Sequence, residues 1–111
     1  MPFVDSAEKL PVEVRTVSLD SYCAAAGVWP SLVKIDVEGA ELMVLRGAAK
    51  VLDRHPVLIV GTHPHWLPAG QSVDQLLGLL TAAGYAVAGY RSTYCAGFEV
   101  GDYLCTPAAG K

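Results

Sequence analysis

The chain has 111 residues, of which 52% are hydrophobic and 17% charged, and its formal net charge is −3. This length suits one domain, and a domain of that size can bury a core. The sequence holds no run of Lys or Arg, so it predicts no nucleic-acid partner. It also holds no apolar run near the ~18 residues that a membrane span needs, so no membrane partner is expected.

The N-terminus and the cysteines indicate the compartment. The sequence does not open on a basic region followed by an apolar run, as a signal peptide does. Cys23, Cys95 and Cys105 are odd in number and show no C-x-x-C spacing. We therefore expect a cytoplasmic protein with reduced, buried thiols, and a Cys95–Cys105 disulfide is the less favoured alternative.

The N-terminal part changes character at residue 12. Residues 1–11 show no period and include two prolines, so we expect a loose lead-in. Residues 12–17 alternate apolar and polar side chains, which predicts a half-buried strand. The domain is expected to extend over residues 12–107, with a short tail at 108–111.

A helix is predicted over residues 19–26. Ser18 is suited to cap its N-terminus, and Gly27 is suited to end it. Asp20 falls in the first turn, where the helix dipole favours an acid. A contact of Asp20 near a functional site is the alternative interpretation.

The next segment passes from a strand to a helix. Residues 32–36 form a short apolar run that ends in an acid, which is typical of a buried parallel strand. Gly39 permits a tight turn because it carries no Cβ. Apolar side chains at three- and four-residue spacing then predict one helix over residues 40–53, and Pro56 prevents its continuation.

A second strand-to-helix unit follows. Residues 57–60 are apolar β-formers and predict another buried parallel strand, which opens into a loop over residues 61–70. Ser72 and Gln75 have the spacing of a capping box, so a helix is expected over residues 73–83.

The C-terminal part predicts two strands, at residues 85–90 and 102–106, with residues 91–101 as the connection between them. Strands that alternate with helices indicate an α/β fold with a mostly parallel sheet. We expect helices on both faces of that sheet and an antiparallel strand at its C-terminal end.

Three carboxylates, Asp36, Glu38 and Glu41, cluster at the end of the first buried strand. Ligands in open α/β sheets bind outside the carboxyl ends of the strands. A carboxylate there can orient a hydroxyl group or hold a cation, although acids at helix starts are also common on structural grounds.

Two histidines, His63 and His65, follow the second buried strand. A neutral imidazole can act as a general base or as a metal ligand. A histidine that faces the crevice from this loop is the favoured interpretation. A metal-dependent hydrolase that uses His63, His65 and Asp36 is a weaker alternative, because these residues match no standard ligand spacing.

Several common motifs are absent from the sequence. It contains no G-x-G-x-x-G after a strand, no P-loop and no G-x-S-x-G elbow. The chain is therefore expected to have no phosphate or cofactor cradle of its own.

The motifs as a group resemble those of a known family, the FkbM family of S-adenosylmethionine-dependent methyltransferases. The resemblance rests on residues 32–41, with the sequence LVKIDVEGAE, and on residues 44–48, with the sequence VLRGA. The flanking segments VRTVSLD at residues 14–20, PVLIV at 56–60 and GY at 84–85 are also similar. One difference is Gly61, which stands where the family usually carries an acid.

The resemblance implies a function and a set of roles. The chain is expected to belong to an O-methyltransferase that acts on a small hydroxylated or sugar-containing acceptor, with S-adenosylmethionine as cofactor. Asp36 would lie beside the methionine end of the cofactor and orient the acceptor hydroxyl. His63 would be the base, and Glu38, Glu41 and His65 would line the acceptor side.

The resemblance covers only the C-terminal half of a class I, Rossmann-like methyltransferase domain. It therefore implies that the glycine-rich loop and the ribose-binding acid lie in an N-terminal half. The strand at residues 32–36 would then have an open edge. That edge would pair with the missing half or with a second copy in a homodimer, or residues 12–17 would fold back over it. A truncated, inactive remnant is the alternative to an active enzyme.

Overall fold

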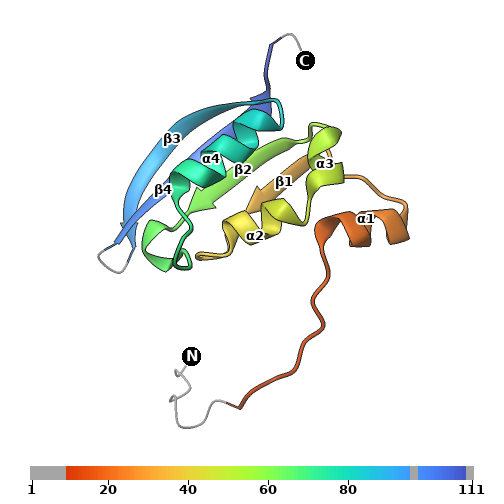
Figure 1. Ribbon diagram of the computed structural model, residues 1–111, viewed down its shortest axis with the longest axis horizontal. Coiled ribbons are helices and arrows are strands. Elements are labelled where there is room, and N and C mark those ends of the chain that lie inside the picture. Colours follow the sequence, from red (N-terminus) through yellow and green to blue (C-terminus); the bar gives the residue numbers. More distant parts are fainter. Residues whose placement is uncertain (1–9, 96–97, 110–111) are drawn as a thin grey trace, which may run out of the picture.

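The computed structural model of the protein describes residues 10–95 and 98–109 (Figure 1). The elements in chain order are α1 (Leu19–Ala26), β1 (Leu32–Ile35), α2 (Glu41–Arg46), α3 (Ala49–Asp53), β2 (Val57–Thr62), the short 3₁₀ helix η2 (Pro64–Trp66), α4 (Val73–Ala82), β3 (Tyr85–Cys95) and β4 (Phe98–Pro107).

The strands of the described residues form a four-stranded sheet in the order β1-β2-β4-β3. β1 pairs with β2 in parallel, and β4 is antiparallel to both of its neighbours. The predicted α/β class and the antiparallel C-terminal strand are therefore confirmed. The expectation of a mostly parallel sheet needs correction. β4 inserts between β2 and β3, so the sheet is mixed and β1–β2 is its parallel pair.

The β3–β4 hairpin is much longer than predicted. The expected connection over residues 91–101 is wrong, because most of it belongs to the two strands. Their register runs from Tyr85 opposite Pro107 to Cys95 opposite Phe98, with a shift between Gly89 and Arg91. An antiparallel hairpin satisfies its own backbone hydrogen bonds over its whole length, so polar residues do not end it.

The helix predicted over residues 40–53 is interrupted at Gly47, between α2 and α3. Asp20 of α1 forms hydrogen bonds with backbone groups on both sides of the interruption. Its backbone N–H donates to the carbonyl of Gly47 at 3.0 Å. Its carboxylate accepts from the N–H groups of Lys50 at 2.9 Å and Val51 at 3.0 Å. Asp20 therefore caps α3 across some thirty residues of sequence, a role that neither sequence interpretation included.

Other predicted helix ends are confirmed. Ser18 accepts from the N–H of Ser21, and Gly27 follows α1 with a left-handed φ of 68°. Ser72 and Gln75 form the expected capping box at the start of α4.

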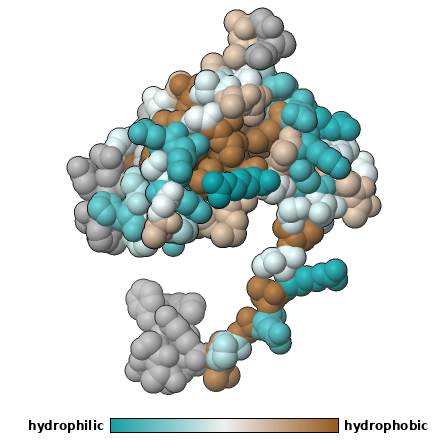
Figure 2. All heavy atoms as spheres, viewed as in Figure 1, coloured by the Kyte–Doolittle hydropathy of each residue, from teal (hydrophilic) through white to brown (hydrophobic). Residues whose placement is uncertain are grey.

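The strand predicted over residues 12–17 is wrong. These residues carry no strand hydrogen bonds, and Val12 and Val14 are 80% and 75% exposed. The segment extends away from the folded body, and hydrophobic residues alternate with hydrophilic ones along it (Figures 1 and 2). A strand needs a paired neighbour for its backbone groups, and this segment pairs with none of the described strands, although the outer edge of β1 is free. It does not fold back over β1.

One face of the sheet packs against the helices. This face contributes Ile35, Leu58, Val60 and Cys105 to a core cluster that also contains side chains of α1, α2, α3 and α4. The helix residues of that cluster are Cys23, Leu42, Leu45, Val51, Leu52, Leu76 and Leu80.

The opposite face, which we call the bare face, has no helix over it among the described residues. By strand alternation it carries Leu32, Lys34, Val57, Ile59, Ala88 and Leu104. Leu32 is 56% exposed and Leu104 38% exposed. The expectation of helices on both faces is therefore wrong for the part of the chain that the structure describes.

Two of the three cysteines can be located. Cys23 and Cys105 are free and buried in the core. The alternative of a Cys95–Cys105 disulfide is therefore excluded, although the side chain of Cys95 itself lies outside the described residues. No helix in the described ranges is long and apolar enough to cross a membrane.

Candidate functional site

The candidate site is built on a tight turn that follows β1. Ala40 donates its N–H to the carbonyl of Val37, and the two residues between them, Glu38 and Gly39, have φ of 48° and 107°. A Cβ at Gly39 would collide with the backbone carbonyl of Trp66 in η2. Only glycine fits this position, so Gly39 lets the turn after β1 pack against the segment after β2.

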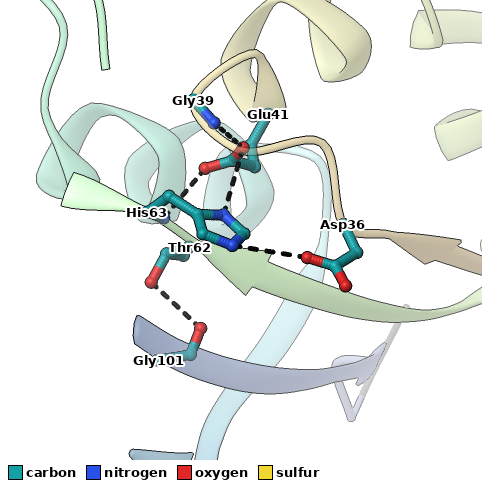
Figure 3. A network of polar contacts seen from close by, with 6 residues as sticks. All are labelled: Asp36, Gly39, Glu41, Thr62, His63 and Gly101. Carbon is teal, nitrogen blue, oxygen red and sulfur yellow. Dashed lines mark hydrogen bonds and ion pairs between the residues drawn. The ribbon is translucent and has the colours of Figure 1, made fainter. Parts of the chain in front are cut away.

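Asp36 and His63 meet at the carboxyl ends of β1 and β2 (Figure 3). His63 Nε2 lies 3.4 Å from Asp36 Oδ1. The Asp36 side chain is 59% exposed, whereas the His63 side chain is only 7% exposed. In this pair, solvent or a ligand can reach the carboxylate, and the fold holds the imidazole in place.

Glu41, the first residue of α2, lies on the other side of the imidazole. The residue is completely buried. Its Oε2 accepts from the N–H of Gly39 at 2.5 Å, and its Oε1 accepts from the N–H of His63 at 3.0 Å. Oε2 also lies 3.5 Å from His63 Nδ1. Hydrogen bonds of this kind offset the cost of burying a carboxylate.

Asp102 of β4 is a site residue that the sequence analysis missed. It pairs with Gly61 in the sheet. A Cβ built on Gly61 would lie 3.3 Å from Asp102 Oδ1, 3.3 Å from Asp36 Oδ1 and 3.6 Å from His63 Cε1. The missing side chain at position 61 therefore leaves room for two carboxylates and an imidazole. No local pattern marks Asp102, because only strand pairing brings it to this position.

The remaining candidates lie outside the network of Figure 3. Glu38 is exposed in the turn, and His65 is exposed in η2. The structure therefore groups Asp36, Glu41 and His63 into one cluster and leaves Glu38 and His65 at its periphery. Within the described ranges, no group of three or more His, Cys, Asp or Glu side chains is arranged to hold a metal ion.

A separate hollow of about 660 Å³ runs beside β1, on the edge away from β2. Its lining is mostly apolar and includes Val17, Val33, Val37 and Met43. Asp36 and His63 do not line it. This hydrophobic hollow therefore adjoins the free edge of β1, whereas the titratable cluster lies at the strand ends.

The comparisons with known proteins identify the family. The model of the methyltransferase FkbM domain matches residues 4–87, which is well over half of the chain and includes β1, β2 and the whole Asp36–Glu41–His63 cluster. No curated protein and no solved structure matches the chain significantly. The extent of the family match is sufficient for assignment, and the chain belongs to the FkbM methyltransferase family.

Proposed function

We propose that this chain carries the acceptor-binding side of an S-adenosylmethionine-dependent O-methyltransferase that acts on a small hydroxylated or sugar-containing molecule. The observation that carries the proposal is the Asp36–His63 pair. Its 3.4 Å Nε2–Oδ1 contact lies where two parallel strands end, which is where open α/β sheets bind ligands. The family match supports methyl transfer as the reaction.

The two side chains suit complementary tasks. Asp36 is exposed and can accept a hydrogen bond from the acceptor, which orients the hydroxyl group. His63 Nε2 is beside it and can take the hydroxyl proton as the oxygen is methylated, so the O–H bond breaks and an N–H bond forms. Glu38 and His65, exposed near the same turn, would contact more distant parts of the acceptor.

The described residues fit only part of the cofactor. Bound S-adenosylmethionine would supply a methyl group that is activated by a positively charged sulfur. The exposed carboxylate of Asp36 suits the cationic methionine end of that molecule. No glycine-rich turn among the described strands offers a place for the adenosine end.

We therefore propose that further polypeptide completes a Rossmann-like sheet along β1. The outer edge of β1 has no neighbour in the described sheet, and the bare face keeps Leu32 and Leu104 exposed. An apolar face and an open edge beside a hydrophobic hollow favour association with another strand-bearing segment. An N-terminal half-domain or a second copy of the chain would provide it.

A second candidate is a subunit or remnant that does not bind cofactor by itself. The open edge and the exposed apolar residues favour it for the 111-residue chain in isolation. The two candidates differ in one measurable property, which is cofactor affinity.

Calorimetric titration of the chain with S-adenosylmethionine separates the candidates. Micromolar binding that weakens about tenfold or more in Asp36→Asn supports a cofactor site in this chain, because a charge-assisted contact is worth about 1.5–3 kcal/mol. Asp53→Asn is the matched control, since Asp53 is an exposed acid at the end of α3, near the start of β2 and so at the opposite end of that strand from the site. Absence of heat with the wild-type chain would favour the second candidate.

A further inference from the structure

Glu41 is placed too deeply to touch an acceptor, so its role has to be sought inside the protein. Its carboxylate has no exposed surface and accepts from the backbone N–H groups of Gly39 and His63. These two bonds tie the turn after β1 to the first residue after β2. The third group that faces this carboxylate is the imidazole of His63.

His63 Nδ1 is buried and makes no hydrogen bond to any of the described residues. Buried polar atoms in folded proteins are nearly always paired. Glu41 Oε2, at 3.5 Å, is the acceptor that faces it. Hydrogen bonds at catalytic groups are often long in unliganded structures and shorten when a ligand binds. A neutral imidazole has a single N–H, so it can donate either from Nδ1 to Glu41 or from Nε2 to Asp36, but not to both. Nδ1 is buried and faces the buried Glu41, whereas Asp36 is 59% exposed and can accept from water instead. The proton is therefore better placed on Nδ1.

We propose that Glu41 is a positioning residue that holds His63 in the tautomer with the proton on Nδ1. Nε2 then carries the lone pair and presents it beside Asp36 Oδ1. The inference rests on the proposed function, because it assigns the direction in which His63 takes up a proton.

This tautomer has a consequence for the ligand. In the neutral state Nε2 and Asp36 Oδ1 are both acceptors, and they are 3.4 Å apart. Two acceptors at this distance repel each other unless a hydrogen-bond donor lies between or beside them. The pair is therefore matched to a group that brings its own proton, such as an alcohol, and it discriminates against an ether or a carbonyl at the same position.

The tautomer can be measured in the isolated chain, without cofactor or activity. Long-range ¹H–¹⁵N NMR spectra distinguish protonated from unprotonated ring nitrogens of histidine at a pH where the ring is neutral. His55 provides an internal reference for the opposite tautomer. Its Nε2 lies 3.0 Å from the carbonyl oxygen of Ala83, which can only accept. We expect a protonated Nδ1 in His63 and a protonated Nε2 in His55.

Substitution then tests the cause. Glu41→Gln replaces one carboxylate oxygen by an amide NH₂, which donates instead of accepting, so we expect the Nδ1-protonated form of His63 to lose its dominance. Glu38→Gln is the matched control, because Glu38 is an exposed acid in the same turn and should leave the His63 spectrum unchanged. His55 should be unaffected in both variants.

Two results would overturn the proposal. One is a wild-type spectrum in which His63 carries its proton on Nε2. The other is a folded Glu41→Gln variant whose His63 spectrum is identical to that of the wild type. If Glu41→Gln does not fold, the wild-type spectrum alone decides. These outcomes do not depend on the calorimetric titration, so failure of the cofactor proposal and failure of the tautomer proposal remain distinguishable.

Discussion

The two faces of the sheet are built from the same strands but have different surroundings. On the helix-covered face Leu58 and Val60 are 1% and 0% exposed. On the bare face Leu32 and Leu104 keep 56% and 38% of their surface. β2 is apolar on both sides over residues 57–60, as are strands in sheets that are covered twice. The difference shows that the described chain supplies cover for one face only.

The candidate site lies where these two environments meet. Glu41 comes from a helix on the covered side and is fully buried, whereas Asp36 is mostly exposed. The imidazole of His63 lies between the two carboxylates. The buried Glu41 faces its Nδ1, and the exposed Asp36 faces its Nε2. A site of this kind combines a rigid support with an approach route for a ligand.

The largest expected contrast is in the unfolding free energy that is lost when a leucine is truncated on each of the two faces. Leu58→Ala should lower the free energy of unfolding by about 2–5 kcal/mol, because it leaves a cavity in a packed core. Leu104→Ala should cost less than about 1 kcal/mol, since that side chain still contacts water. Urea denaturation followed by circular dichroism measures both. Equal losses would mean that the bare face is covered in solution.

A smaller effect is expected from Asp20, which holds the helices of the covered face together. Asp20→Ala removes the acceptor for the N–H groups of Lys50 and Val51, and should cost roughly 1–2 kcal/mol of unfolding free energy. Asp53→Ala, at the exposed C-terminal end of α3, is the control and should change stability by less than about 0.5 kcal/mol. A loss no greater than that of the control would show that α3 does not depend on this cap.

The smallest effect is a dependence on alkaline pH that comes from the covered face. Burial raises the pKa of the Cys105 thiol from its ordinary 9.0 to about 11. Burial, and to a lesser extent the nearby Cys105, raises the pKa of the Tyr85 hydroxyl to about 12. Both groups become charged when they lose their proton, and burial in the folded chain disfavours the charged form. The unfolded chain therefore loses these protons at lower pH than the folded chain does. The stabilisation is complete below pH 9 and is lost as the pH rises toward 11 and 12.

At pH 10 the unfolded chain has released most of the Cys105 proton and the folded chain has kept it. This difference lowers the free energy of unfolding by about 1 kcal/mol relative to pH 8. Thermal or urea unfolding at pH 8 and pH 10 measures it, and Cys105→Ala should remove most of the difference between the two. A wild-type stability that stays constant from pH 8 to pH 10 would contradict the burial of this thiol.

Local signals in the sequence predicted much of the fold. The helix starts at Ser18 and Ser72 were predicted because capping depends on side chains within three residues of each other. The strands before Asp36 and His63 were predicted because continuous apolar β-formers have few alternatives in a short domain. The turn at Gly39 was predicted because a positive φ favours glycine.

Features that depend on distant contacts were missed. The helix interruption at Gly47 is bridged by hydrogen bonds to Asp20, and the hairpin extends beyond Tyr90 through pairing between β3 and β4. The strand prediction at residues 12–17 followed a correct alternation, but a strand also requires a paired neighbour, and this segment pairs with none of the described strands.

The sequence by itself determined the α/β class, the family, and the positions of Asp36 and His63 directly after two strands. Each of these depends on residues that are contiguous in the chain. Only the tertiary structure decided that Glu41 is buried beside His63, that Asp102 reaches the space over Gly61, and that one face of the sheet stays bare. These properties depend on strand order and helix packing, which join residues far apart in the chain and leave no local pattern.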